Sequence, residues 1–159
     1  MDPASIIRVS GVAIQLIGLL GKYIQTLSDL QGRWKDADLL LLNLRTQLNT
    51  LRAALSAICQ WMSLGETDES YLLRIELDGS LQCCQILANK VNLFLDSVQS
   101  STKFRNSTLD LRKRFKLVFR GSSLDDVLQM IDRQTASMNL LLTACHWLAK
   151  PLSSEVLKY

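Results

Sequence analysis

The sequence predicts an all-α fold, and three observations support this prediction. Apolar residues recur at alternating steps of three and four along four long segments, which is the spacing of one face of a helix. The two prolines stand at positions 3 and 151, so nothing between them forbids long helices. No segment alternates apolar and polar residues over a useful length, as a strand would. The pattern indicates an antiparallel four-helix bundle, to which a fifth short helix near residues 103–118 can be added.

The whole chain, residues 1–159, is expected to form one domain, because this length leaves little room for two. Apolar residues make up 48% and charged residues 21%, which is typical of a globular protein and excludes general disorder. The formal net charge of +3 is too small to imply nucleic acid, so no nucleic-acid partner is expected.

The first helix is predicted from about residue 3 to residue 27. Asp2 can cap its start, and Pro3 suits the first helical position. The apolar residues cover more than one face, which is wider than a surface helix requires. The helix is therefore either central in the bundle or able to change its environment. The residues are Ile6, Ile7, Val9, Ala13, Ile14, Leu16, Ile17, Leu20 and Ile24.

The stretch GVAIQLIGLLGKY, residues 11–23, carries no charge before Lys22 and could be taken for a targeting segment. A signal peptide is disfavoured because the preceding MDPAS is acidic rather than basic. A constitutive membrane span needs about 20 apolar residues in a row, and Arg8, Gln15 and Lys22 interrupt this run. The stretch is expected to lie in the core at rest, with membrane entry as a conditional second state.

Heptad-like spacing predicts the second helix over about residues 34–62 and the third from residue 71 or 77 to residue 98. Gly79 falls inside the third, so that helix is expected to start or bend there. The apolar positions of the second helix are Leu41, Leu44, Leu48, Leu51, Leu55, Ile58 and Met62. Those of the third are Leu77, Leu81, Cys84, Ala88, Val91, Leu95 and Val98.

The fourth helix is predicted over about residues 124–149. Ser122 or Ser123 can cap its start, and Asp125 and Asp126 in the first turn suit the helix dipole. Pro151 marks its end. Its apolar positions are Leu124, Leu128, Ile131, Met138, Leu141, Cys145 and Leu148.

Motifs of enzymes and metal sites are missing from the sequence, so we expect no catalytic residues, no cofactor and no metal. His146 is the one histidine, and no Cys/His cluster exists. No phosphate-binding or dinucleotide-binding glycine motif occurs. The cysteines contain no CxxC motif and are expected to be small buried hydrophobic residues. They are Cys59, Cys83, Cys84 and Cys145.

The strongest local charge feature is KFRNSTLDLRKRFKLVFRG, residues 103–121, which we call the basic segment. It contains one acid, Asp110, and three interleaved phenylalanines. One interpretation is a solvated link whose phenylalanines hold it to the bundle. A second is a surface for anionic lipid, with cations at the phosphates and aromatic rings at the interface. A third is a nucleic-acid surface, although no recognised binding motif surrounds the segment. The candidate lipid-binding residues are Lys103, Arg105, Arg112, Lys113, Arg114, Lys116 and Arg120.

Several stretches together resemble the fungal N-terminal domains of STAND (NLR-like) proteins. The opening MDPASIIRVSGVAIQLIGLLGKYIQTL is similar to the start of those domains, and LLLLNLRTQLNTLRAAL resembles their second helix. LDGSLQCCQILANKVNLFL resembles their third helix. RKRFKLVFRGSSLDDVLQMIDRQTASMNLLLTA resembles their basic, aromatic stretch and last helix. The resemblance covers nearly the whole chain through many soft matches.

The resemblance implies the N-terminal effector or signalling domain of a larger fungal NLR-like receptor. Related HeLo and HeLo-like domains execute cell death: the receptor drives oligomerisation, and the first helix is released to permeabilise the plasma membrane. It implies a homo-oligomer, a receptor partner in cis or in trans, a membrane with anionic lipids, and a cytoplasmic protein that relocates to the plasma membrane. Carried over by position, the inserting residues are Ile6, Ile7, Gly11, Ile14, Leu16, Ile17, Gly18, Leu20, Gly21 and Ile24.

Two features of this sequence limit the implied mechanism. Some killing relatives carry a glycine zipper in the first helix, whereas the glycines at 11, 18 and 21 form no GxxxG motif. Arg8 and Lys22 lie about 21 Å apart along a helix, short of a hydrocarbon core of about 30 Å. An interfacial or bilayer-thinning mode is therefore favoured over a simple span. The alternative function is a soluble adaptor or oligomerisation module without membrane activity.

Overall fold

The computed structural model describes residues 3–31, 38–63, 71–100, 112–114, 117 and 124–149. These residues are helical except Ser100, which lies in a turn, and no strand occurs among them. The all-α prediction is therefore confirmed for this part of the chain. Residues 112–114 and 117 are helical within the region expected to hold a fifth short helix.

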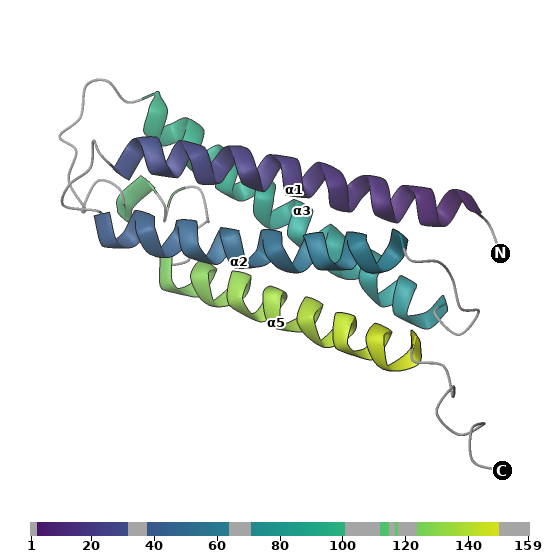
Figure 1. Ribbon diagram of the computed structural model, residues 1–159. Coiled ribbons are helices and arrows are strands. Elements are labelled where there is room, and N and C mark those ends of the chain that lie inside the picture. Colours follow the sequence, from purple (N-terminus) through teal and green to yellow (C-terminus); the bar gives the residue numbers. More distant parts are fainter. Residues whose placement is uncertain are drawn as a thin grey trace, which may run out of the picture.

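Four long helices make up the fold (Figure 1). They are α1 (Pro3–Gln31), α2 (Asp38–Ser63), α3 (Tyr71–Gln99) and α5 (Leu124–Ala149). Helix α3 begins at Tyr71, as one of the two predicted starts had it, and continues through Gly79 rather than starting there. Leu77 and Leu81 on either side of it are both buried, and this tertiary packing outweighs the low helix propensity of glycine.

The four helices form a ring in the order α1, α2, α5, α3. Helix α1 packs against α2 and α3, and α5 packs against the same two helices. The remaining pairs, α1 with α5 and α2 with α3, lie diagonally across the bundle with far less contact. Because α1 has two neighbours rather than one, its apolar surface has to be wide.

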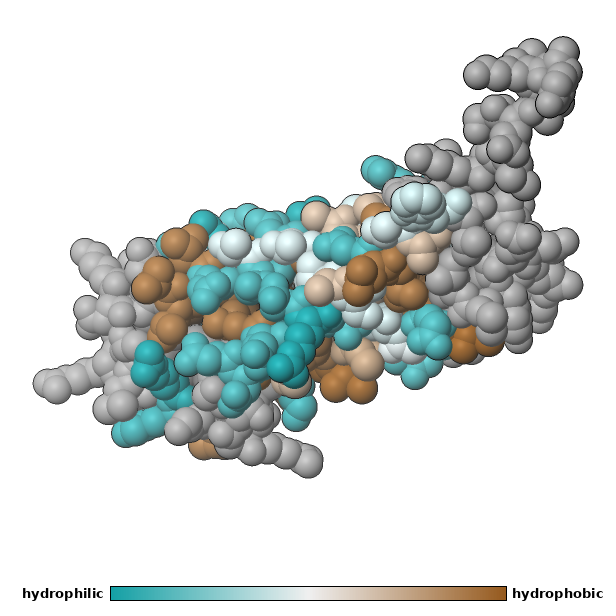
Figure 2. Space-filling view, turned by 90° about the horizontal axis from the view of Figure 1, so that it is seen from below, coloured by the Kyte–Doolittle hydropathy of each residue, from teal (hydrophilic) through white to brown (hydrophobic). Residues whose placement is uncertain are grey.

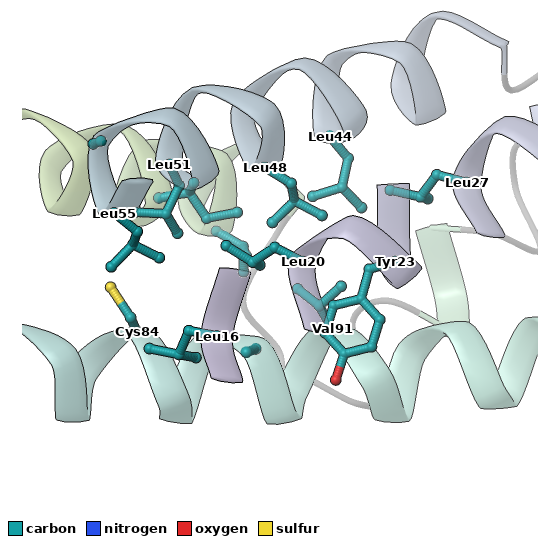
Figure 3. Packing of buried hydrophobic residues seen from close by; sticks show 14 of the residues in the cluster. Leu16, Leu20, Tyr23, Leu27, Leu44, Leu48, Leu51, Leu55, Cys84 and Val91 are labelled. Atoms are coloured by element: carbon teal, nitrogen blue, oxygen red, sulfur yellow. The ribbon is translucent and has the colours of Figure 1, made fainter. Parts of the chain in front are cut away.

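Specific contacts give the directions of the helices that flank α1. Ser10 lies beside Met62 and Ser28 beside Arg45, so α1 and α2 run in opposite directions. Leu16 lies on the α3 side near Ala88, and Tyr23 lies near Val91, so α1 and α3 run in the same direction (Figure 3). Figure 1 accordingly shows α1 and α3 ending where α2 and α5 begin.

The core lies along the axis of this ring. The predicted apolar positions of α2 are buried from Leu41 to Ile58, with Met62 half-buried, and all seven predicted positions of α3 are buried. Phe94 and Val127 are also fully buried, although the predicted sets did not contain them. Thr135 is the one buried polar side chain among the described residues, and its hydroxyl donates to the carbonyl of Ile131 at 2.9 Å. Figure 3 shows leucines of α1 and α2 meeting above α3.

Candidate functional site

The predicted membrane-inserting residues of α1 fall into three groups. Leu16 and Leu20 are buried in the core, and Ile17 and Ile24 are half-buried against it. Gly21 is also half-buried. The exposed members are Gly11, Ile14 and Gly18. The side chains of Ile6 and Ile7 lie outside the described part of the structure.

The helical period explains this division. The core face of α1 follows Val9, Ala13, Leu16, Leu20 and Tyr23, at steps of three and four. Ile14 points away from that face and is 62% exposed. A Cβ built on Gly11 or Gly18 would meet no atom within 4 Å, so both glycines border open space. The structure therefore separates α1 into a core face and an outer face, and from Val9 onward Ile14 is the one large apolar side chain exposed on the outer face.

The basic segment is described in part. Arg112 and Lys113 are exposed, and Leu117, four residues after Lys113, is 83% exposed. Arg114 differs from them because it is half-buried, and its Nη1 donates to the carbonyl oxygen of Ser97 at 2.7 Å. That carbonyl belongs to the last turn of α3, where a cation is favourable to the helix dipole. Arg114 thus holds the described part of the segment to the bundle, whereas the first interpretation gave this role to the phenylalanines, which lie outside the described residues.

The other predicted lipid-binding cations lie outside the described residues. They are Lys103, Arg105, Lys116 and Arg120.

The described part of the basic segment lies at the end of the bundle where α1 and α3 end and α2 and α5 begin (Figure 1). Leu39 at the start of α2 is 77% exposed at this end. The N-terminus of α1 lies at the opposite end, and the 29 residues of α1 span about 43 Å. The described part of the basic segment and the C-terminal end of α1 therefore lie at the same end of the bundle, whereas the start of α1 lies at the other end.

The cysteines differ from one another, and the prediction that all are buried is wrong for one. Cys84 is buried, whereas Cys83 is exposed and Cys59 is half-buried. Consecutive residues of a helix point about 100° apart, so a vicinal pair at the edge of a core places one side chain outside. Burial raises the pKa of the Cys84 thiol to about 12, with a smaller contribution from Cys83 in the same direction. The side chain of Cys145 is not among those described.

A shallow groove of about 280 Å³ lies between α1 and α3. Its polar lining consists of the amide side chains Gln15, Gln85 and Asn89, over Leu16 and Ala88. Amides neither transfer protons nor act as nucleophiles at neutral pH. No group of three or more His, Cys, Asp or Glu side chains in the described part of the chain could hold a metal ion. The side chain of His146 is outside that part.

Large apolar side chains are also exposed on the outer faces of α3 and α5, which the sequence analysis did not single out. On α3 they are Ile75, Ile86 and Leu93, and on α5 they are Met130, Leu140 and Trp147. Figure 2, seen from the side on which α5 lies, shows the apolar residues of that face in separate groups among hydrophilic ones. The sequence could have revealed the exposed apolar residues of α3, because Ile86 and Leu93 are one heptad apart and do not belong to the predicted core positions of that helix.

Within the described ranges, no helix combines the length and the apolar character that crossing a bilayer requires. Comparisons with protein-family models, with curated proteins and with solved structures found no match.

Proposed function

We propose that this chain is the N-terminal signalling domain of a fungal NLR-like receptor, with a HeLo-like helical bundle, that oligomerises and acts at the plasma membrane to cause regulated cell death. The sequence resemblance motivates this assignment. The observation that supports a membrane role is the pair of exposed cations, Arg112 and Lys113, together with the exposed Leu117 in the same segment. Cations bind lipid phosphates, and an adjacent apolar side chain enters the headgroup boundary.

In the proposed mechanism, the end of the bundle that carries the basic segment contacts the membrane first. The C-terminal part of α1 is already at this end. Release of α1 would have to remove Leu16 and Leu20 from the core, so binding energy from lipid and from neighbouring copies must offset that loss. The protein is cytoplasmic in the resting state of this proposal and relocates only on activation.

Co-sedimentation with liposomes tests the first step. Wild type is expected to sediment with vesicles of phosphatidylcholine and phosphatidylserine, and to remain in solution with phosphatidylcholine alone. Arg112→Ala should weaken partitioning about fivefold, because one cation near an anionic surface contributes about 1 kcal/mol. Arg133→Ala is the matched control, since Arg133 is an exposed cation on α5 outside the basic segment. Equal losses in both variants, or no anionic preference, would overturn the membrane role of the basic segment.

Reversible locking of α1 tests the second step. Ser10 and Met62 lie in contact across α1 and α2, with 3.7 Å between Oγ and Sδ. Both would be changed to Cys in a chain whose Cys59, Cys83 and Cys145 are replaced by Ser, and joined by a reducible bismaleimide. Dye release from anionic liposomes should stop while α1 is locked and return on reduction. Equal release from locked and unlocked protein would show that α1 stays in the bundle.

The alternative is a soluble adaptor or oligomerisation module. The observation that favours it is the exposed apolar positions on α3, which suit contact with another helix. Self-association without any lipid binding would select this alternative.

A further inference from the structure

Two arginines of α2 lie along the outer edge of its contact with α1, and we call Arg45 and Arg52 the arginine pair. The Nη1 of Arg45 donates to the hydroxyl of Ser28 at 3.4 Å. The guanidinium of Arg52 lies over Gly21, and its Cζ, Nε and Nη2 are the nearest atoms to the position of a Cβ there. Each arginine of α2 is therefore placed against a small residue of α1.

The arginine pair has no acidic partner in the described part of the chain. Its printed contacts are those with Ser28 and Gly21, and neither arginine has a further interaction. Asp29 is the one acid among the described side chains of α1 and α2, and its Oδ1 accepts from the amide of Gln25 at 3.2 Å. The described cations of the two helices are Lys22, Arg45 and Arg52. The contact between α1 and α2 therefore carries an excess of positive charge.

The position of Arg45 makes the missing anion notable. This side chain is half-buried, and arginines withdrawn from water are usually paired with an opposite charge. The hydroxyl of Ser28 is neutral, and it accepts from only one of the donors of the guanidinium. The remaining donors of Arg45 and those of Arg52 are left for a ligand. A guanidinium matches phosphate with two parallel hydrogen bonds, so phosphate is the group that this arrangement favours.

The spacing of the arginine pair indicates how many phosphates the ligand carries. Arg45 and Arg52 are seven residues apart, and so are Gly21 and Ser28 on α1, which is about 10.5 Å along each helix. The two guanidiniums therefore suit two phosphate groups of one ligand. Asn49 lies between the arginines on α2 and is exposed, so its amide can donate to the same ligand. Contacts with α1 already hold both guanidiniums, and less side-chain freedom is lost on binding.

We propose that the arginine pair, at the contact between α1 and α2, is a binding site for a ligand that carries two or more phosphate groups. Soluble polyphosphates and phosphorylated lipid headgroups share this chemistry. The site is separate from the basic segment, and it does not rest on the proposed membrane function.

Isothermal titration calorimetry with inositol hexakisphosphate at low salt tests the site. Wild type should bind this soluble polyphosphate, and Arg52→Gln should weaken binding about tenfold, because it removes a charged donor to phosphate. Arg133→Gln is the matched control, since Arg133 is also an exposed arginine but lies on α5. No binding by wild type, or equal losses from Arg52→Gln and Arg133→Gln, would overturn the proposal.

Further variants separate the arginine pair from general attraction to positive charge. Arg52→Lys keeps the charge but loses the paired donors of the guanidinium, so its affinity should lie between those of wild type and Arg52→Gln. Arg45→Gln should weaken binding as Arg52→Gln does, and circular dichroism should show that it remains folded. A loss confined to Arg112→Gln would place the ligand on the basic segment and overturn the proposal.

Nuclear magnetic resonance of isotope-labelled protein locates the ligand directly. Inositol hexakisphosphate should shift the backbone amide signals of Gly21, Ser28 and Asn49 most strongly. Shifts centred on residues 112–114 instead would overturn the site.

Vesicles distinguish the two sources of phosphate. Wild type and Arg52→Gln would be sedimented with phosphatidylcholine vesicles that contain phosphatidylinositol bisphosphate. Weaker sedimentation of Arg52→Gln supports a lipid headgroup as the ligand, whereas equal sedimentation, together with the loss of soluble binding, supports a soluble polyphosphate. The calorimetry contains no membrane, so its failure leaves the liposome results on the basic segment intact, and failure of those liposome tests leaves this site intact.

Discussion

The guanidinium of Arg52 on α2 lies over Gly21 on α1, with its Cζ 3.5 Å from the position that a Cβ on Gly21 would occupy. This is an ordinary van der Waals distance, and the atoms met are the far end of a flexible side chain. Gly21 is therefore a point of close approach between α1 and α2 that still has room for one methyl group.

Gly21→Ala should stabilise the protein rather than disrupt it. Alanine is favoured over glycine in a helix interior by roughly 0.5–1 kcal/mol, and Arg52 need not move. Gly18→Ala should give a similar gain, since that site borders open space. Thermal unfolding should show melting temperatures a few degrees higher for both variants. A lower melting temperature for Gly21→Ala alone would mean that Arg52 is held rigidly over the helix.

Leu48→Ala should both destabilise the bundle and increase membrane activity. Leu48 is buried on α2 against the α1 leucines (Figure 3), and emptying such a site costs about 2–5 kcal/mol. Denaturant unfolding should record this loss, whereas Leu140→Ala at an exposed site should change the free energy of unfolding by less than about 0.5 kcal/mol. Because α1 keeps its own sequence, faster dye release from anionic liposomes by Leu48→Ala would support release of α1. Unchanged dye release would argue against it.

Arg114→Ala should reduce stability without acting through lipid. It removes the charged hydrogen bond to the Ser97 carbonyl at the end of α3, a type of bond that contributes about 1.5–3 kcal/mol. Arg112→Ala and Lys113→Ala remove exposed side chains and should leave the free energy of unfolding nearly unchanged. Liposome binding should instead be weakened more by Arg112→Ala and Lys113→Ala than by Arg114→Ala. A large stability loss from Arg112→Ala would contradict this division of roles.

Stability should fall at high pH because of Cys84. Burial raises the pKa of this thiol in the folded state to about 12, from an ordinary value of 9.0. Between these values the unfolded chain loses a proton that the folded chain retains, so the free energy of unfolding decreases as pH rises, by at most about 1.4 kcal/mol per pH unit. Urea unfolding between pH 8 and 11 should show this slope, and Cys84→Ala should reduce it. Burial also raises the pKa of Tyr23, with Asp96 adding to the shift. Tyr23→Phe should therefore also reduce the slope of the free energy of unfolding against pH, by less than Cys84→Ala does.

Alkylation provides a direct check on the vicinal pair. Iodoacetamide at pH 8 should label Cys83, which is exposed, and leave Cys84 unlabelled in the folded protein. Peptide mass spectrometry would distinguish the two sites. Labelling of both in the folded protein would show that the α3 side of the core opens readily.

The sequence was sufficient to predict the helices and most of the core, because burial along α2 and α3 repeats every three and four residues from Leu41 to Ile58 and from Leu77 to Val98. It could not predict which apolar residues of α1 face solvent. Ile14 and Leu16 have the same character, and only the positions of α2 and α3 around α1 decide that one is exposed and the other buried.

The candidate site shows the same limit. Arg112, Lys113 and Arg114 are adjacent cations, and Arg112 and Arg114 have the same side chain, so the sequence does not reveal which of them is held by the bundle. Their roles diverge because Arg114 reaches the carbonyl of Ser97 at the end of α3, whereas the side chains of Arg112 and Lys113 are exposed. Proximity between segments that are distant in sequence is a property of the packed bundle rather than of local pattern.

The positions of the helix ends have a practical consequence for fusion proteins. Helix α1 begins and α5 ends at the same end of the bundle, opposite the basic segment (Figure 1). A trimerisation tag joined after Ala149 would therefore hold several copies by one end and leave their cationic ends pointing away from the tag. Such a fusion imposes stoichiometry without covering Arg112, Lys113 or Leu117, and tags of different valence would measure how many copies a membrane response requires.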